Sequence, residues 1–135
     1  MEQQERENII EFKDVCKTYR MGEVEINALS NINFEIKRGE FVIVLGQSGA
    51  GKTTILNILG GMDTATRGSV IVDGKNITNY SAKQLTEYRR ENVGFVFQFY
   101  NLIANLNVLE NVEFAASVKK NTLDPYEILE KVGLS

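Results

Sequence analysis

The chain has 135 residues, of which 43% are hydrophobic and 24% charged, as expected of one soluble globular domain of ordinary size. Its formal net charge of −3, without a basic cluster, argues against a nucleic-acid partner. Apolar runs are far shorter than the ~20 residues of a membrane span, and the charged N-terminus is unlike a signal peptide. The one cysteine, Cys16, cannot form an internal disulfide, which fits a reducing cytosol.

The first part of the chain predicts an antiparallel sheet. After a solvated leader at residues 1–8, apolar residues alternate with charged ones from Ile9, and polar and apolar residues alternate again through 32–36. Alternation of this kind is typical of strands with one exposed face. Residues 37–40 predict a turn, and the unbroken apolar run Phe41–Leu45 predicts a buried strand after it.

A phosphate-binding motif follows this run. Residues 46–54 fit the pattern G-x-x-x-x-G-K-[ST], and the apolar residues after them recur at helical spacing. N–H groups at a helix N-terminus bind anions, and glycine allows the backbone angles with which a chain wraps phosphates closely. A strand and a helix predicted on either side make a chance match in a glycine-rich turn a poor alternative. The predicted nucleotide-binding residues of this P-loop are Gly46, Gln47, Ser48, Gly49, Ala50, Gly51, Lys52, Thr53 and Thr54.

Two side chains of the P-loop are suited to specific chemistry. The Lys52 ammonium is placed to contact the β- and γ-phosphates of a nucleoside triphosphate. The Thr53 hydroxyl is suited to ligate Mg²⁺. The motif therefore predicts binding of a nucleotide together with Mg²⁺.

The middle of the chain predicts a hairpin, a helix and a second buried strand. Residues 69–77 alternate up to Asp73-Gly74, a pair typical of a type I′ turn. A capping box at 81–84 opens a helix that runs to about residue 91. The unbroken apolar run Val93–Phe97 predicts a strand covered on both faces.

The last part of the chain predicts two further helices. Asn107 and Glu110 cap a helix through about residue 119. Asp124-Pro125 opens another helix, and Gly133 is placed to end it.

In the order and spacing of these motifs, the chain resembles the ATP-binding subunit of ABC transporters from about Ile10 to Ala115. It is most similar to the subgroup that serves lipoprotein release, macrolide efflux and antimicrobial-peptide export. The resemblance implies an α/β fold. Residues 9–98 would form part of a P-loop NTPase core with an antiparallel β subdomain, and residues 99–135 the Q-loop and the start of a helical subdomain. The segments that carry the resemblance are the P-loop with Leu56-Asn57, Lys17–Gly22, Gly39–Val42 and Arg89–Val112.

The resemblance implies roles for two more residues in binding ATP and Mg²⁺. Tyr19 stands where the family has an aromatic residue that stacks on adenine, a contact worth ~1–3 kcal/mol. Gln98 matches the Q-loop glutamine, which reaches Mg²⁺ and the attacking water; it is thus a predicted metal ligand with Thr53 and a predicted catalytic residue with Lys52. The alternatives are an ordinary half-buried tyrosine and a polar residue that ends a strand.

The resemblance also implies protein partners and a location. Residues Tyr100–Leu106 would receive the coupling helix of a transmembrane permease, because this loop is more apolar than a free loop should be. The alternative is that its side chains pack inward beneath the next helix. A second nucleotide-binding subunit would complete the site. The expected location is the cytoplasm, peripheral on the inner face of the cell membrane through the permease.

Parts of the family's hydrolytic apparatus do not occur in this sequence. It has no apolar strand that ends in Asp-Glu, no Leu-Ser-Gly-Gly-Gln signature and no histidine for the γ-phosphate. We therefore expect an N-terminal fragment of an ABC-type ATPase that does not hydrolyse ATP alone. The alternatives are a non-hydrolysing regulatory module of the cell-division type and, less favoured, a small-molecule P-loop kinase.

The missing part also affects the predicted sheet. In the family, strands from the C-terminal half separate Phe41–Leu45 from Val93–Phe97. Buried backbone groups without partners cost ~1–3 kcal/mol each, so two open apolar strands are unfavourable. We therefore expect these two strands either to pair directly or to be swapped between chains in a homo-oligomer.

Overall fold

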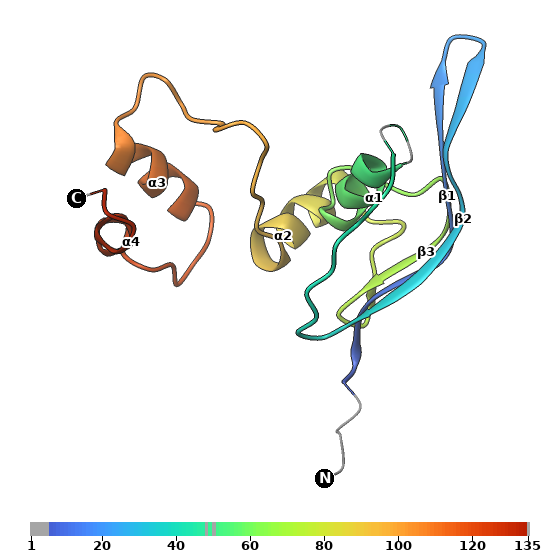
Figure 1. The fold of residues 1–135 in the computed structure, drawn as a ribbon, viewed down its shortest axis with the longest axis horizontal. Coiled ribbons are helices and arrows are strands. Elements are labelled where there is room, and N and C mark those ends of the chain that lie inside the picture. The colour runs from blue at the N-terminus through green and yellow to red at the C-terminus, as the bar shows by residue number, and fades with distance from the viewer. Residues whose placement is uncertain (1–5, 48, 50, 135) are drawn as a thin grey trace. The chain divides into compact units, whose positions relative to one another are not determined.

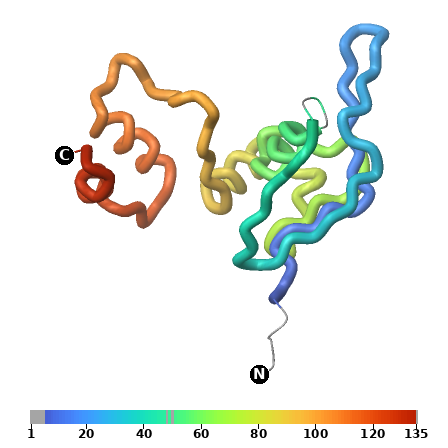
Figure 2. The backbone as a smooth tube through the Cα atoms, viewed as in Figure 1, coloured from blue at the N-terminus to red at the C-terminus, as the bar shows by residue number. Residues whose placement is uncertain are grey.

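A computed structural model describes residues 6–47, 49 and 51–134 (Figure 1). The chain forms two compact units, Met1–Tyr88 and Arg89–Ser135, and the division between them lies within helix α2 (Ala82–Asn92). The first unit holds the sheet and the P-loop, and the second holds the last two helices. Figure 2 shows the path of the first unit from the sheet through residues 38–47 to the P-loop helix.

The first unit is built on an antiparallel sheet with strand order β2-β1-β3-β4. β1 (Asn8–Met21) and β2 (Val24–Lys37) form a long hairpin, and β3 (Arg67–Val72) lies along the other edge of β1. The predicted strands from Ile9 and around residues 32–36 are thus confirmed. Phe12 is 2% exposed, and its ring stacks on that of Phe34 opposite it, with the centroids 4.4 Å apart. Burial of one such ring stabilises the fold by about 1.5–3 kcal/mol.

A bulge in β1 explains why two successive residues, Val15 and Cys16, are both buried. The pairing of β1 with β2 shifts register between Phe12 and Val15, and the pairing with β3 shifts between Lys13 and Cys16. Asp14 has a φ of 50° in this stretch. Because a bulge adds one residue to a strand, it interrupts the strict alternation of faces. Two neighbouring side chains therefore share the core.

β3 and β4 (Lys75–Asn76) form the predicted hairpin. Asp73 and Gly74 have φ angles of 50° and 76°, the positive values that a type I′ turn requires. The Asp73 carboxylate also forms an ion pair with Arg38 in the turn after β2. This contact joins two turns that lie far apart in the sequence.

Helices begin at the predicted caps. α1 (Lys52–Leu59) follows the P-loop, and α2 opens with reciprocal hydrogen bonds of 2.9 and 3.2 Å between Ser81 and Gln84. α3 (Val108–Ala116) has the capping box expected from Asn107 and Glu110, but it ends before the predicted residue 119. α4 (Pro125–Lys131) is capped by Asp124. Caps are predictable because they depend on residues only three positions apart.

The two predicted buried strands are wrong for this structure. In the part of the chain that is described, neither Phe41–Leu45 nor Val93–Phe97 belongs to a strand. Phe41 is 92% exposed, and Val96 is fully exposed. An unbroken apolar run is buried only if neighbouring strands bond its edges and other elements cover its faces. Direct pairing of the two segments is therefore also wrong, whereas exchange between chains stays a prediction.

Candidate nucleotide-binding site

The P-loop and β2 together line a pocket with a volume of about 370 Å³. Gly51 brings the loop against the sheet. A Cβ at this position would lie 2.8 Å from the carbonyl oxygen of Ala28 and 2.8 Å from Cδ2 of Leu29. Its φ of 88° also belongs to the region that favours glycine, so both space and backbone require glycine here. The residues that line the pocket are Ile26, Asn27, Ala28, Gly49, Gly51, Lys52, Thr53 and Thr54.

The end of the pocket at α1 offers positive charge and N–H donors. The Lys52 ammonium donates a hydrogen bond of 2.5 Å to the carbonyl oxygen of Gly46, so it lies across the loop. Gly51 caps α1 without a side-chain hydrogen bond, and the first turn of α1 has no acidic residue. The free N–H groups and the helix dipole are therefore not offset by a side chain. Such a helix end is suited to hold a chain of phosphates.

The threonines of the motif fit a Mg²⁺ ion bound together with phosphates. Thr53 and Thr54 lie in the first turn of α1 and line the pocket, with Thr53 exposed. Mg²⁺ is usually held by one or two protein oxygens, with water and substrate phosphates as its other ligands. Among the described residues, no group of three or more Asp, Glu, Cys or His side chains could hold a metal. Gln47 is exposed, and the predicted site residues Ser48 and Ala50 lie outside the described residues.

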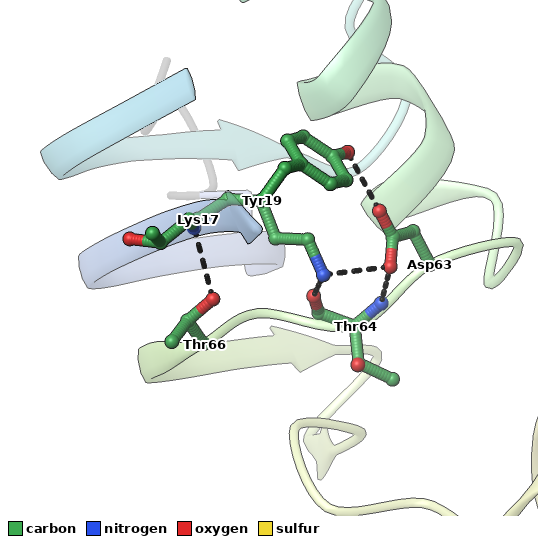
Figure 3. A network of polar contacts seen from close by, with 6 residues as sticks. Lys17, Tyr19, Asp63, Thr64 and Thr66 are labelled. Carbon is green, nitrogen blue, oxygen red and sulfur yellow. Dashed lines mark hydrogen bonds and ion pairs between the residues drawn. The ribbon is translucent and has the colours of Figure 1, made fainter. Parts of the chain in front are cut away.

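Tyr19 lies in β1, where a polar network joins it to the loop after α1 (Figure 3). Its hydroxyl donates a hydrogen bond of 2.7 Å to Oδ2 of Asp63. The Lys17 ammonium donates bonds of 2.8 Å to Oδ1 of Asp63 and 2.7 Å to the carbonyl oxygen of Thr64. The same ammonium lies 5.0 Å from the centre of the Tyr19 ring, within the range of a cation–π contact.

The hydrogen bonds of this network keep the Asp63 carboxyl ionised. Partial burial acts to raise the pKa of the Asp63 carboxyl, but hydrogen bonds from Lys17, Tyr19 and the Thr64 N–H outweigh it, and the pKa is lowered. Burial, followed by the bond to Asp63, raises the pKa of the Tyr19 hydroxyl. At neutral pH Asp63 is therefore a carboxylate and Tyr19 a donor to it. The sequence reasoning assigned no role to Asp63 or Lys17.

Gln98 and the predicted partner surface lie in the second unit. Gln98 is exposed in a bend, and the strand expected to present it does not form. Its catalytic role therefore stays a prediction. Tyr100 is 93% exposed and Leu102 is largely exposed, so these two side chains do not pack inward.

The backbone of the Tyr100–Leu106 loop is bonded to α3 through one side chain, that of Asn111. Its Oδ1 accepts a hydrogen bond of 2.8 Å from the N–H of Ile103. Its Nδ2 lies 2.9–3.2 Å from three carbonyl oxygens to which it donates, those of Ile103, Leu106 and Asn107. The helix thereby fixes the path of the second half of the loop.

Residues 29–135 match the family described as ABC transporter. The chain belongs to the ABC transporter family. An uncharacterised ABC transporter ATP-binding protein of Methanocaldococcus jannaschii, MJ0796, is 50% identical over 105 residues, which are 78% of this chain and 45% of that protein. Another from Thermotoga maritima is 41% identical over 131 residues, 93% of this chain and 56% of that protein. The macrolide export ATP-binding/permease protein MacB of Mannheimia succiniciproducens is 41% identical over 132 residues, 94% of this chain and 20% of that protein.

Solved structures of ABC cassettes confirm the predicted fold class. A dimeric structure of the ATP-binding cassette MJ0796 in a post-hydrolysis state, bound to ADP and Pi, has a TM-score of 0.81 at 44% identity. The alignment covers 90% of this chain and 54% of that chain. This chain thus spans about half the length of the MJ0796 and Thermotoga maritima proteins, and a fifth of that of MacB. Membership of the family argues against the small-molecule kinase alternative. None of the described helices is both long and apolar enough to cross a membrane.

Proposed function

We propose that this chain is the ATP-binding part of the nucleotide-binding subunit of an ABC transporter, and that it binds Mg-ATP with the phosphates in the P-loop. The geometry of the P-loop is the observation that supports this most directly. The N-terminus of α1 has no side-chain cap, the Lys52 ammonium lies across the loop, and Gly51 lies against β2. These groups supply positive charge and N–H donors to a ligand that bears several negative charges.

Four of the predicted site residues have specific roles in this proposal. Lys52 pairs with the β- and γ-phosphates, the Thr53 hydroxyl holds Mg²⁺, and Tyr19 stacks on adenine. When bound, Mg²⁺ offsets the charge that develops on the phosphates. Gln98 is proposed to act on the same metal and on the attacking water. Its exposed position in the second unit leaves its side chain available for such a role.

The whole protein is proposed to use ATP binding and hydrolysis to drive transport through a membrane permease. The exposed Tyr100 and Leu102 support a docking surface at Tyr100–Leu106. The dimeric structure of the MJ0796 cassette supports a second nucleotide-binding subunit as a partner. The chain would then work in the cytoplasm, on the inner face of the membrane.

Calorimetric titration of the 135-residue chain with Mg-ATP tests this proposal. We expect Lys52→Ala to weaken binding by roughly 1.5–3 kcal/mol, because it removes a charge-assisted contact to the phosphates. Lys83→Ala, which removes an exposed lysine of α2 outside the pocket, is the matched control and should bind as the parent does. Equal affinity of the parent and Lys52→Ala would refute the site. Without the Asp-Glu pair, the signature and the histidine, we also expect no steady ATP hydrolysis above that of Lys52→Ala.

A further inference from the structure

The Tyr19 side chain joins two segments that lie far apart in the sequence. Tyr19 belongs to β1, and its hydroxyl donates a hydrogen bond of 2.7 Å to Asp63 in the loop after α1. One phenol group therefore connects the strand with the loop that follows the phosphate-binding helix.

Lys17 restricts the ring in a second way. Its ammonium lies over one face of the Tyr19 ring while it is bonded to Asp63 and to the carbonyl oxygen of Thr64 (Figure 3). Its side chain is only 12% exposed, and that of Asp63 is 26% exposed, so solvent screens this pair less than an ion pair at the surface. A base that stacks on this ring must use the opposite face. The plane of the ring is thus set before a base arrives, which reduces the entropy lost on binding.

We propose that Asp63 is a positioning residue for the nucleotide base, and that it acts by holding the Tyr19 ring and the Lys17 ammonium in place against each other. Asp63 itself does not touch the nucleotide. The inference rests on the proposed binding of ATP at the P-loop, which it extends to the orientation of the adenine platform. A merely structural role for Asp63 would be to tie the loop after α1 to the sheet, which would affect all ligands of the pocket alike.

Inorganic tripolyphosphate distinguishes these two roles, because it carries the phosphate chain without a base. The quantity to measure is the ratio of the Kd for Mg-tripolyphosphate to the Kd for Mg-ATP, on the same preparation of each variant. Partial unfolding of a variant lowers both apparent affinities by the same factor, so it cancels in the ratio. We expect Tyr19→Ala to lower this ratio roughly 5- to 100-fold, as loss of a stacked base does. Asp63→Ala should lower it about 3- to 10-fold, because the ring remains but is no longer held.

Two further variants sharpen the test. Asp73→Asn is the matched control for Asp63→Asn. It also removes one carboxylate from an ion pair, and asparagine accepts the positive φ of this position. Asp73→Asn should leave the ratio unchanged, whereas Asp63→Asn should lower it less than Asp63→Ala, since its amide oxygen still accepts from Tyr19. Tyr19→Phe keeps the ring, removes its hydroxyl, and should lower the ratio to about the extent that Asp63→Ala does.

The decisive measurement adds Asp63→Ala to Tyr19→Ala. If Asp63 acts through Tyr19, the second substitution has no further effect on the ratio. The inference is overturned if Asp63→Ala lowers the ratio equally in the parent chain and in Tyr19→Ala. It is also overturned if the ratio stays at the parent value in Asp63→Ala and Tyr19→Phe. Either result leaves the proposed binding of ATP intact. A parent chain that binds neither ligand refutes the proposed function, and this inference with it. A parent that binds both ligands equally tightly refutes only the adenine platform and its positioning by Asp63.

Discussion

Strand β1 is buried in the sheet, whereas the more hydrophobic run Phe41–Leu45 is exposed. β1 pairs with β2 through a short turn, and the side chains of Phe12 and Val15 are buried on either side of the bulge. Residues 41–45 have no place in the sheet, and Phe41 is 92% exposed. The difference teaches that a strand with one exposed face can be completed by neighbouring strands and a single covering layer, whereas a strand buried on both faces needs elements that cover each face. The P-loop follows the exposed run in the sequence and contacts the sheet at Gly51.

A pair of phenylalanines tests this comparison most strongly. Phe12→Ala should lower the free energy of unfolding by about 3–5 kcal/mol, because it leaves a cavity in the core of the sheet. Phe41→Ala should change it by no more than about 0.5 kcal/mol, because the ring is exposed. Urea denaturation followed by circular dichroism measures both values. A large loss of stability in Phe41→Ala would show that residues 41–45 are packed in solution, and would contradict the comparison.

Substitution of two glycines in the P-loop tests whether the nucleotide site depends on contact with the sheet. Gly51→Ala should reduce stability by about 2 kcal/mol or more and abolish ATP binding, because its Cβ would meet Ala28 and Leu29 of β2 and its φ is unfavourable. Gly49→Ala has the same type of φ but no atom within 4 Å of its Cβ, so about 1 kcal/mol is expected. Denaturation and Mg-ATP titration of both variants provide the comparison. Equal effects would mean that contact with the sheet does not shape the loop.

The smallest expected effect concerns pH. The pKa of Asp63 is lowered in the folded chain, so its carboxylate stabilises the fold above the unfolded pKa of about 3.9. This contribution is lost as pH falls through the lowered folded pKa. Between pH 7 and 5, the difference in urea midpoint between the parent and Asp63→Asn should therefore stay constant, and below about pH 4 it should shrink. A difference that changes near neutral pH would place the titration elsewhere.

Features that depend on neighbours in the sequence were predictable. The turn at Asp73-Gly74, the capping boxes at Ser81 and Asn107 and the P-loop helix all have the predicted form. The family, and with it the fold class, could be named because the P-loop and the segments around it stand in a characteristic order.

Features that depend on distant partners were not predictable. The strand predictions at 41–45 and 93–97 failed because an apolar run contains no information on whether its partner strands are present. The contacts of Asp63 were missed because its partners Tyr19 and Lys17 lie 44 and 46 residues away along the chain. A polar residue in a loop gives no local sign of such a contact.

Asn111 fixes the backbone of the Tyr100–Leu106 loop independently of the exposed side chains of this loop. A single amide on α3 holds the backbone at Ile103, Leu106 and Asn107, whereas the exposed side chains of Tyr100 and Leu102 are not needed for that hold. Exposed side chains can be exchanged at little cost to stability. The exposed side chains of the loop can therefore be substituted while the path of its backbone stays constant. Substitutions at Tyr100 and Leu102 therefore leave the bonds between the loop and α3 unchanged.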